Sequence, residues 1–191
     1  MTPSSEQYAQ IAAMFTTGID EDIKTSIELL IPAHLPVQGG LWLVPYAGRE
    51  ASMGRAMLIR MHEETVDIAA IGDGNFSLEG CNSIDALLER IDSPVQSWII
   101  QPCPNADPTE LLHCDADRIT LLSGADQAAV VGAYRILKGF ASSVEDVSDL
   151  PLIRIVIVGA EERAASDAAS RIVQTAKQQL DIQIEVGPAL P

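Results

Sequence analysis

The chain reads Ser97-Trp98-Ile99-Ile100-Gln101, then Arg118-Ile119-Thr120-Leu121-Leu122, then an apolar run from Leu152 to Val158, and these three stretches decide the fold. Each is short and rich in β-branched and aliphatic residues. The last run is interrupted only by Arg154, which is typical of a strand covered on both faces. We therefore expect three strands of a mainly parallel sheet.

Two helices are predicted between these strands. Asp107 followed by Pro108 is a helix start with an N-cap and a proline at the first helical position. The turn Ser123-Gly124-Ala125-Asp126 leads into a second helix, in which apolar residues recur at helical spacing: Ala129, Val130, Ala133, Tyr134, Leu137 and Phe140. This alternation predicts a βαβαβ unit with right-handed parallel crossovers.

The same residues carry a resemblance to a known family. Ser97 to Pro102, Cys114 to Leu122 and Ala133 to Lys138 resemble the second half of the MinD/ParA family of P-loop ATPases, closest to its FlhG-like members. Ile153 to Ala160, the helix after it and a final strand running into Gly187-Pro188 resemble the last two strands of that family. The resemblance implies a three-layer, Rossmann-like α/β fold with helices on both faces of the sheet.

The sequence departs from that family where the catalytic residues would stand. A P-loop needs a lysine for the β- and γ-phosphates and an adjacent hydroxyl for magnesium, and the nearest candidate, Gly48 to Arg55, has neither. The aspartate that would organise magnesium is Gln101, and the asparagine that would read adenine is Gly159. We therefore expect no ATP hydrolysis and no cofactor, although the frame can survive because packing and catalysis depend on different residues.

The loop formed by Ser123, Gly124, Ala125 and Asp126 is the residual candidate for ligand binding. It follows a parallel strand at its carboxyl end, where α/β sheets place ligands, and in the family it borders the nucleotide base. The alternative role is structural, because Asp126 can cap the helix that it opens. A nonstandard site there and around Gly72-Asp73-Gly74 would instead make the protein an enzyme or a nucleotide-binding protein.

The cysteines and histidines predict no catalytic residue and no metal site. Cys81, Cys103 and Cys114 are odd in number and lack C-x-x-C spacing, so we expect reduced, buried thiols. His113 beside Cys114 could suggest a base and a nucleophile, but sequence neighbours seldom point at each other and no third group orients them.

The N-terminal half is predicted to begin with a helical extension over residues 1–34, followed by the α/β domain over residues 35–191. The extension would hold one helix from Glu6 to Phe15 and a second that starts at Asp20 and carries Ile23, Ile27, Leu30 and Ile31.

Further strands are predicted on both sides of the central unit. Leu41 to Tyr46 is expected to form one, and Ala56–Met61 with Val66–Ile71 an antiparallel pair near the N-terminal edge of the sheet. A helix is expected around Ile84 to Ile91, a long one from Glu161 to Leu180, and an edge strand at Ile182 to Val186.

Charge and hydropathy exclude several classes of partner. The chain has 27 acidic and 12 basic residues, a net charge of -15, which opposes binding to nucleic acid or to anionic membranes. It holds no apolar run of the roughly 20 residues that a membrane span needs. The sequence thus predicts a cytoplasmic, non-catalytic regulatory or scaffold protein that acts through protein contacts, and it leaves the oligomeric state open.

Overall fold

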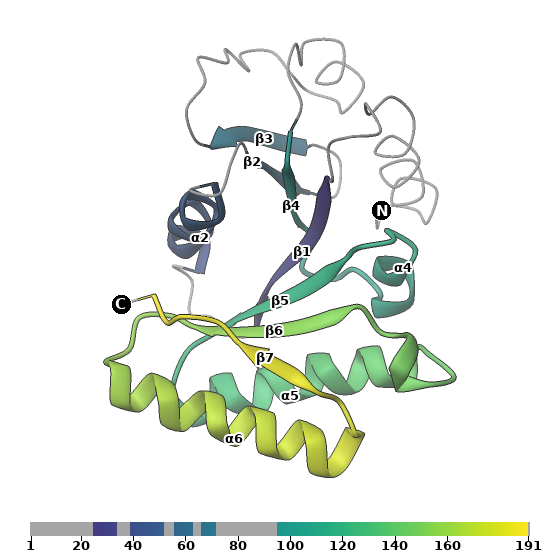
Figure 1. The fold of residues 1–191 in the computed structure, drawn as a ribbon, viewed down its shortest axis with the longest axis vertical. Helices are drawn as coiled ribbons and strands as arrows, with labels where there is room; N and C mark the ends of the chain where they lie inside the picture. The colour runs from purple at the N-terminus through teal and green to yellow at the C-terminus, as the bar shows by residue number, and fades with distance from the viewer. Residues whose placement is uncertain (1–24, 34–38, 52–55, 63–65, 72–94, 191) are drawn as a thin grey trace. The chain divides into compact units, whose positions relative to one another are not determined.

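The computed structural model describes residues 25–33, 39–51, 56–62, 66–71 and 95–190 (Figure 1). The chain divides into two compact units. Unit 1 comprises Met1–Leu29 and Val44–Asp117, and unit 2 comprises Leu30–Leu43 and Arg118–Pro191.

Unit 1 is built on β3, β2, β4 and the first half of β1, in that order. β4 is parallel to both β1 and β2, whereas β3 is antiparallel to β2. β4 therefore has a paired strand on each side, and neither of them is the next strand along the sequence. In a simple βαβαβ unit, consecutive strands would pair. The strands are β1 (Ser26–Ala33), β2 (Ala56–Met61), β3 (Val66–Ile71) and β4 (Ser97–Gln101).

The predicted antiparallel pair is confirmed with the same bounds. β2 and β3 pair from Ala56 opposite Ile71 to Met61 opposite Val66. Beyond the last pair, His62 Nε2 lies 2.9 Å from Asp67 Oδ2 on the surface. β3 stands at the end of the strand order, as expected for the N-terminal edge.

The helix predicted from Asp20 through Ile31 is wrong over its second half, because Ser26–Ala33 forms β1. Four consecutive residues from Ile27 to Leu30 are buried, which suits a strand covered on both sides better than a helix with one apolar stripe. Asp117 anchors the start of the strand: its Oδ2 accepts from Ile27 N–H at 2.8 Å, and its own N–H donates to Ile27 O at 2.9 Å.

The strand predicted at Leu41 to Tyr46 is also wrong. The chain forms a 3-10 turn, η1 (Gly39–Trp42), and then the helix α2 (Leu43–Glu50). Pro45 is compatible with this helix because it lies in the first turn, where a backbone N–H has no intrahelical acceptor. Consequently Gly48 belongs to a helix, and the stretch from Gly48 to Arg55, which the sequence already disfavoured as a P-loop, is helical over its first three residues.

Unit 2 contains the strands β5 (Arg118–Ser123), β6 (Leu152–Ile157) and β7 (Ile184–Val186), parallel and in that order. The tail beyond β7 stays beside β6, since Leu190 N–H donates to Ile157 O and Gly159 N–H to Leu190 O. A short 3-10 turn, η3 (Val147–Asp149), precedes β6.

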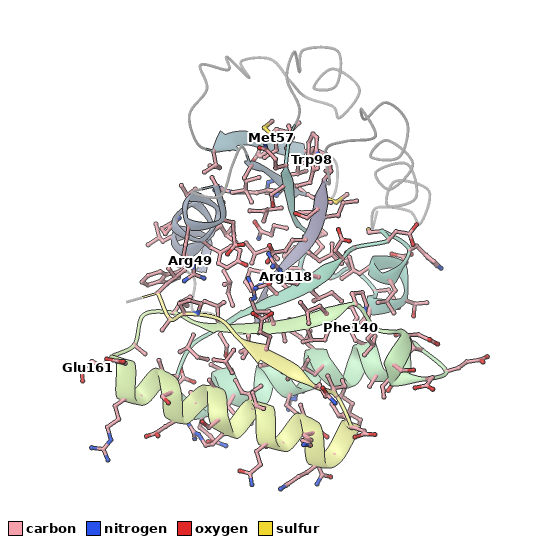
Figure 2. All side chains as sticks on the ribbon, in the orientation of Figure 1. Arg49, Met57, Trp98, Arg118, Phe140 and Glu161 are labelled. Atoms are coloured by element: carbon pink, nitrogen blue, oxygen red, sulfur yellow. The ribbon has the colours of Figure 1, made fainter. Side chains whose placement is uncertain are left out.

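The helices α5 (Gln127–Ser142) and α6 (Glu162–Leu180) lie side by side against these strands (Figure 1). Of the apolar residues predicted on one face of α5, five are buried and Tyr134 is half-buried; the buried ones are Ala129, Val130, Ala133, Leu137 and Phe140. Phe140, labelled in Figure 2, points from α5 toward the strands and is fully buried. Alanines at 165, 168, 169 and 176 of α6 keep the helix close to its neighbours because they leave little side chain between the backbones.

The predicted fold class is confirmed: the protein has a mainly parallel α/β sheet with one antiparallel pair, flanked by helices. The short helix α4 (Pro108–Leu112) begins as predicted, with Asp107 Oδ1 accepting from Thr109 N–H at 2.8 Å. The predicted helices from Glu6 to Phe15 and around Ile84 to Ile91, the turn Gly72-Asp73-Gly74 and Cys81 lie outside the described residues.

Gly187 is expected to tolerate no side chain. A Cβ there would lie 2.8 Å from Val156 Cγ2 and 3.2 Å from Arg154 Cδ, too close for normal contacts. Because the neighbouring side chains would have to shift, Gly187→Ala should lower the free energy of unfolding by about 1 to 3 kcal/mol. Gly48→Ala is the matched control, because nothing lies within 4 Å of its Cβ and alanine favours the α2 helix by up to about 1 kcal/mol. Urea unfolding of both variants measures the difference. Equal stability of the two would contradict the packing described for Gly187.

Candidate functional site

The loop predicted as a residual binding site links β5 to α5 in unit 2. Ser123 is the last residue of β5 and is fully buried. Its hydroxyl donates to Gly124 O at 3.1 Å, and its carbonyl accepts from Val158 N–H at 2.9 Å. The end of β5 is thereby tied to the end of β6, as expected where parallel strands finish at one edge of a sheet.

Asp126 performs the capping role that the sequence left open. Its Oδ1 accepts from Ala129 N–H at 2.8 Å, and its backbone carbonyl accepts from Val130 N–H at 3.1 Å. A Cβ on Gly124 would lie 3.3 Å from Ala129 Cβ, so glycine allows the loop to approach the helix closely. The only carboxylate of the loop thus faces its own helix.

Arg171 of α6 adds a contact to this loop that sequence reasoning missed. Its Nη2 donates to Ala125 O and its Nη1 to Gln127 Oε1, both at 3.2 Å. Its Nε contacts Asp167 O at 3.4 Å, within its own helix. Only the packing of α6 beside α5 brings this exposed side chain to residues about 45 positions earlier.

Gly159, at the end of β6, is covered by an aromatic ring. It adopts a left-handed conformation, with φ of 66°, which favours glycine. The ring of Trp42 lies against it, so that Trp42 Cζ2 would be 3.2 Å from a Cβ at this position. This contact was not predicted, because Trp42 was expected in a strand.

Unit 1 holds a buried polar pair that the sequence analysis did not single out. Glu28 of β1 and Tyr46 of α2 are both inaccessible to solvent, and Tyr46 Oη donates a hydrogen bond to Glu28 Oε1. The Arg49 guanidinium lies 5.3 Å from the centre of the Tyr46 ring. The sequence signal was an acidic residue inside an apolar run, Ile27-Glu28-Leu29-Leu30. The pair holds α2 against β1.

Neither the thiols nor the histidines assemble into a nucleophilic site in the part of the chain that the structure describes. Cys103 and Cys114 are free and buried, as predicted. Burial and, second, the charge of Asp115 raise the pKa of Cys114 to about 12, which keeps it protonated at neutral pH. His113 lies at the C-cap of α4 and is exposed. Within the described ranges, no three His, Cys, Asp or Glu side chains are grouped to hold a metal ion.

A membrane-spanning helix needs an apolar run of about 20 residues, which the sequence does not hold. None of the helices described here combines the length and the apolar character that a membrane crossing requires.

Comparison with known proteins finds similarity only to solved structures. No family model matches the chain, and no curated protein does. It is similar to the structure of an ATP complex of a McdA variant from Cyanothece, with 13% identity and a TM-score of 0.48 over 87% of this chain and 83% of that chain. It is also similar to a ParA family ATPase from Chlorobium tepidum TLS, with 11% identity and a TM-score of 0.39 over 98% of this chain and 77% of that chain. At these identities neither structure assigns a residue role to this chain.

The capping role of Asp126 can be tested against a helix that lacks it. Asp126→Ala should lower the free energy of unfolding by about 0.5 to 2 kcal/mol, because the Ala129 N–H loses its acceptor. Glu161 occupies the same position at the start of α6 but makes no side-chain cap, so Glu161→Ala should change stability much less. Urea titrations compare the two variants. A larger loss for Glu161→Ala would refute the assignment.

Cys114 should be inert in the folded protein. With a pKa of about 12, only about one thiol in ten thousand is ionised near pH 8, so a thiolate-selective reagent should react with Cys114 only after denaturation. In a double variant with Cys81→Ser and Cys103→Ser, Cys114 is the one remaining cysteine, so any labelling reports on Cys114. The folded pKa exceeds the unfolded value of about 8.5, so this thiol's contribution to stability is present below that pH and declines above it. Rapid native labelling would show an accessible thiolate and reopen the question of a thiol enzyme.

Proposed function

We propose that this protein is a non-catalytic, cytoplasmic regulatory or scaffold protein, built on a frame that resembles the MinD/ParA ATPases and acting through contacts with other proteins. The proposal follows from the chemistry of the segment that would have to hold a phosphate chain. It does not depend on the overall similarity to the solved ATPase structures.

The connection from β1 to α2 carries the proposal. A P-loop lies between a strand and the helix that follows it, and here that connection reads His34-Leu35-Pro36-Val37-Gln38-Gly39-Gly40-Leu41-Trp42. If Gly40 is the glycine before the P-loop lysine, Leu41 stands at the lysine position and Trp42 at the hydroxyl position. The nearest lysines in the sequence are Lys24 and Lys138, far from this connection along the chain. An aliphatic and an aromatic side chain cannot neutralise phosphate charge or bind magnesium.

Two further positions support the same proposal. Gln101, at the end of β4, is a neutral amide where the resemblance expects a magnesium-organising carboxylate. Gly159, at the end of β6, offers no side chain to read a base, and Trp42 lies against it. Phosphate binding, metal support and base recognition would each have to come from other groups.

The loop Ser123–Asp126 supports a structural role over the alternative of a nonstandard nucleotide site. Its carboxylate caps α5, and Arg171 contacts its Ala125 carbonyl. A ligand would have to compete with both interactions.

Nucleotide binding and turnover test the proposal directly. We expect no thermal shift with ATP, ADP or GTP and magnesium, whereas a ligand at 100 times its dissociation constant would stabilise the protein by about 2.7 kcal/mol. Phosphate release should equal the background. Leu41→Glu is the matched control: Leu41 is 66% exposed, so the fold should persist, while a carboxylate would repel phosphate. Turnover that Leu41→Glu abolishes would overturn the proposal and place a site at this connection. Turnover that persists in the variant would overturn it too if the activity co-purifies with the chain, and would be a contaminant's if it does not.

A further inference from the structure

The outer edge of unit 2 presents a strand that is paired on one side. β7 is the last strand in the order and pairs with β6. Gly187 N–H donates to Ile155 O at 2.9 Å, and backbone groups alternate in direction along a strand, so Ile184 and Val186 turn their N–H and C=O groups to the outer side. In the part of the chain that the structure describes, no strand pairs with that side.

An apolar cavity lies beside this edge. Its volume is about 180 Å³, and the residues that line it include Ile157, Glu162, Ala165, Ser166, Ala169 and Val186. This is smaller than the roughly 300 to 1,000 Å³ of a typical small-molecule site, so it suits a single large side chain better than a nucleotide. Val186 is 52% exposed and belongs both to the cavity wall and to the strand edge.

The charges around the cavity indicate the character of a partner. Glu161 and Glu162 are exposed at the start of α6, where Figure 2 labels Glu161. Glu185 of β7 is also exposed, although its carboxylate contacts Arg154 at 3.0 Å, and Arg163 is the one basic residue in the same turn of α6. With a net charge of -15, the chain favours a basic partner and repels a second copy of itself.

We propose that the β7 edge binds an extended basic segment of a partner protein, which adds a strand beside β7 and inserts one apolar side chain into the cavity. In this mode the main-chain hydrogen bonds supply affinity and the side-chain pocket supplies specificity. The inference deepens the proposed protein-contact function and rests on it.

The short length of β7 limits the affinity of this site. Only three residues form the strand, and Pro188 follows soon after it, which is how proteins restrict pairing at an exposed edge. The inserted side chain therefore contributes much of the binding. Filling the cavity should weaken binding about tenfold to a hundredfold, the equivalent of one apolar side chain no longer buried.

Selection from a phage-displayed library of random short peptides on the full chain tests the proposal. We expect enriched peptides to carry one large apolar residue flanked by lysine or arginine, without proline beside it. Synthetic versions are then measured by fluorescence anisotropy against the unmodified chain and its variants.

Two pairs of variants test the site: the Ser166 pair acts on the cavity alone, and the Val186 pair acts on the strand edge together with the cavity wall. Ser166→Phe should fill the cavity from an exposed position and weaken binding, whereas Ser170→Phe, on the same helix but outside the lining, should not. Val186→Pro should remove an outward N–H without breaking the β6 ladder, whereas Val186→Thr keeps it. Thermal unfolding of each variant confirms that the fold persists.

The outcomes are distinguishable. Absence of basic, apolar peptides from the selection, or peptides whose binding survives both Ser166→Phe and Val186→Pro, would overturn the edge site. Concentration-dependent dimerisation that Val186→Pro abolishes would identify a second copy as the occupant and also overturn it. ATP turnover would refute the non-catalytic function without affecting the peptide result.

Discussion

The backbone hydrogen bond from Val158 N–H to Ser123 O, together with the parallel pairing of β5 and β6, is the constraint on which the rest of unit 2 depends. It brings the carboxyl ends of two strands to one edge of the sheet. α5 starts just beyond the first end and α6 just beyond the second, so both helices enter from the same edge and can pack on each other. Because α6 is held there, Arg171 contacts the loop before α5. The tail after β7 is held beside β6 by the same kind of ladder.

In this arrangement, groups at the strand ends that could bind a ligand contact other parts of the same unit instead. An open helix N-terminus and a free carboxylate are the features that attract ions and nucleotides in many α/β proteins. Here Asp126 caps α5, Arg171 covers the Ala125 carbonyl, and the Trp42 ring lies on Gly159. These interactions stabilise the unit, and a ligand at the same edge would have to displace them. β7 also carries an exposed large apolar residue, Val186.

Several elements could be predicted from the sequence because their signals are local. Asp107-Pro108 and Asp126 mark helix starts by capping chemistry, and the structure has both caps. The hairpin at Ala56–Ile71 follows from two apolar runs and a short turn. The two wrong predictions, the second half of a helix from Asp20 through Ile31 and a strand at Leu41 to Tyr46, share a cause. Both stretches fit a helix and a strand equally well. The apolar residues in Ile27-Glu28-Leu29-Leu30-Ile31 have helical spacing but also form a continuous run, as in a buried strand. The stretch from Leu41 to Tyr46 is apolar enough for a strand, but its Pro45 is also allowed in the first turn of a helix.

The sequence by itself determined the α/β class, the strands and helices from Ser97 onward, and the absence of a P-loop lysine between Lys24 and Lys138, because composition, periodicity and residue identity are readable without coordinates. Only the tertiary structure decided that β4 pairs with β1 and β2, that Arg171 meets Ala125, and that Trp42 lies on Gly159. These contacts join residues tens of positions apart, and their free energy is realised only when the chain closes those loops, so no local pattern in the sequence encodes them.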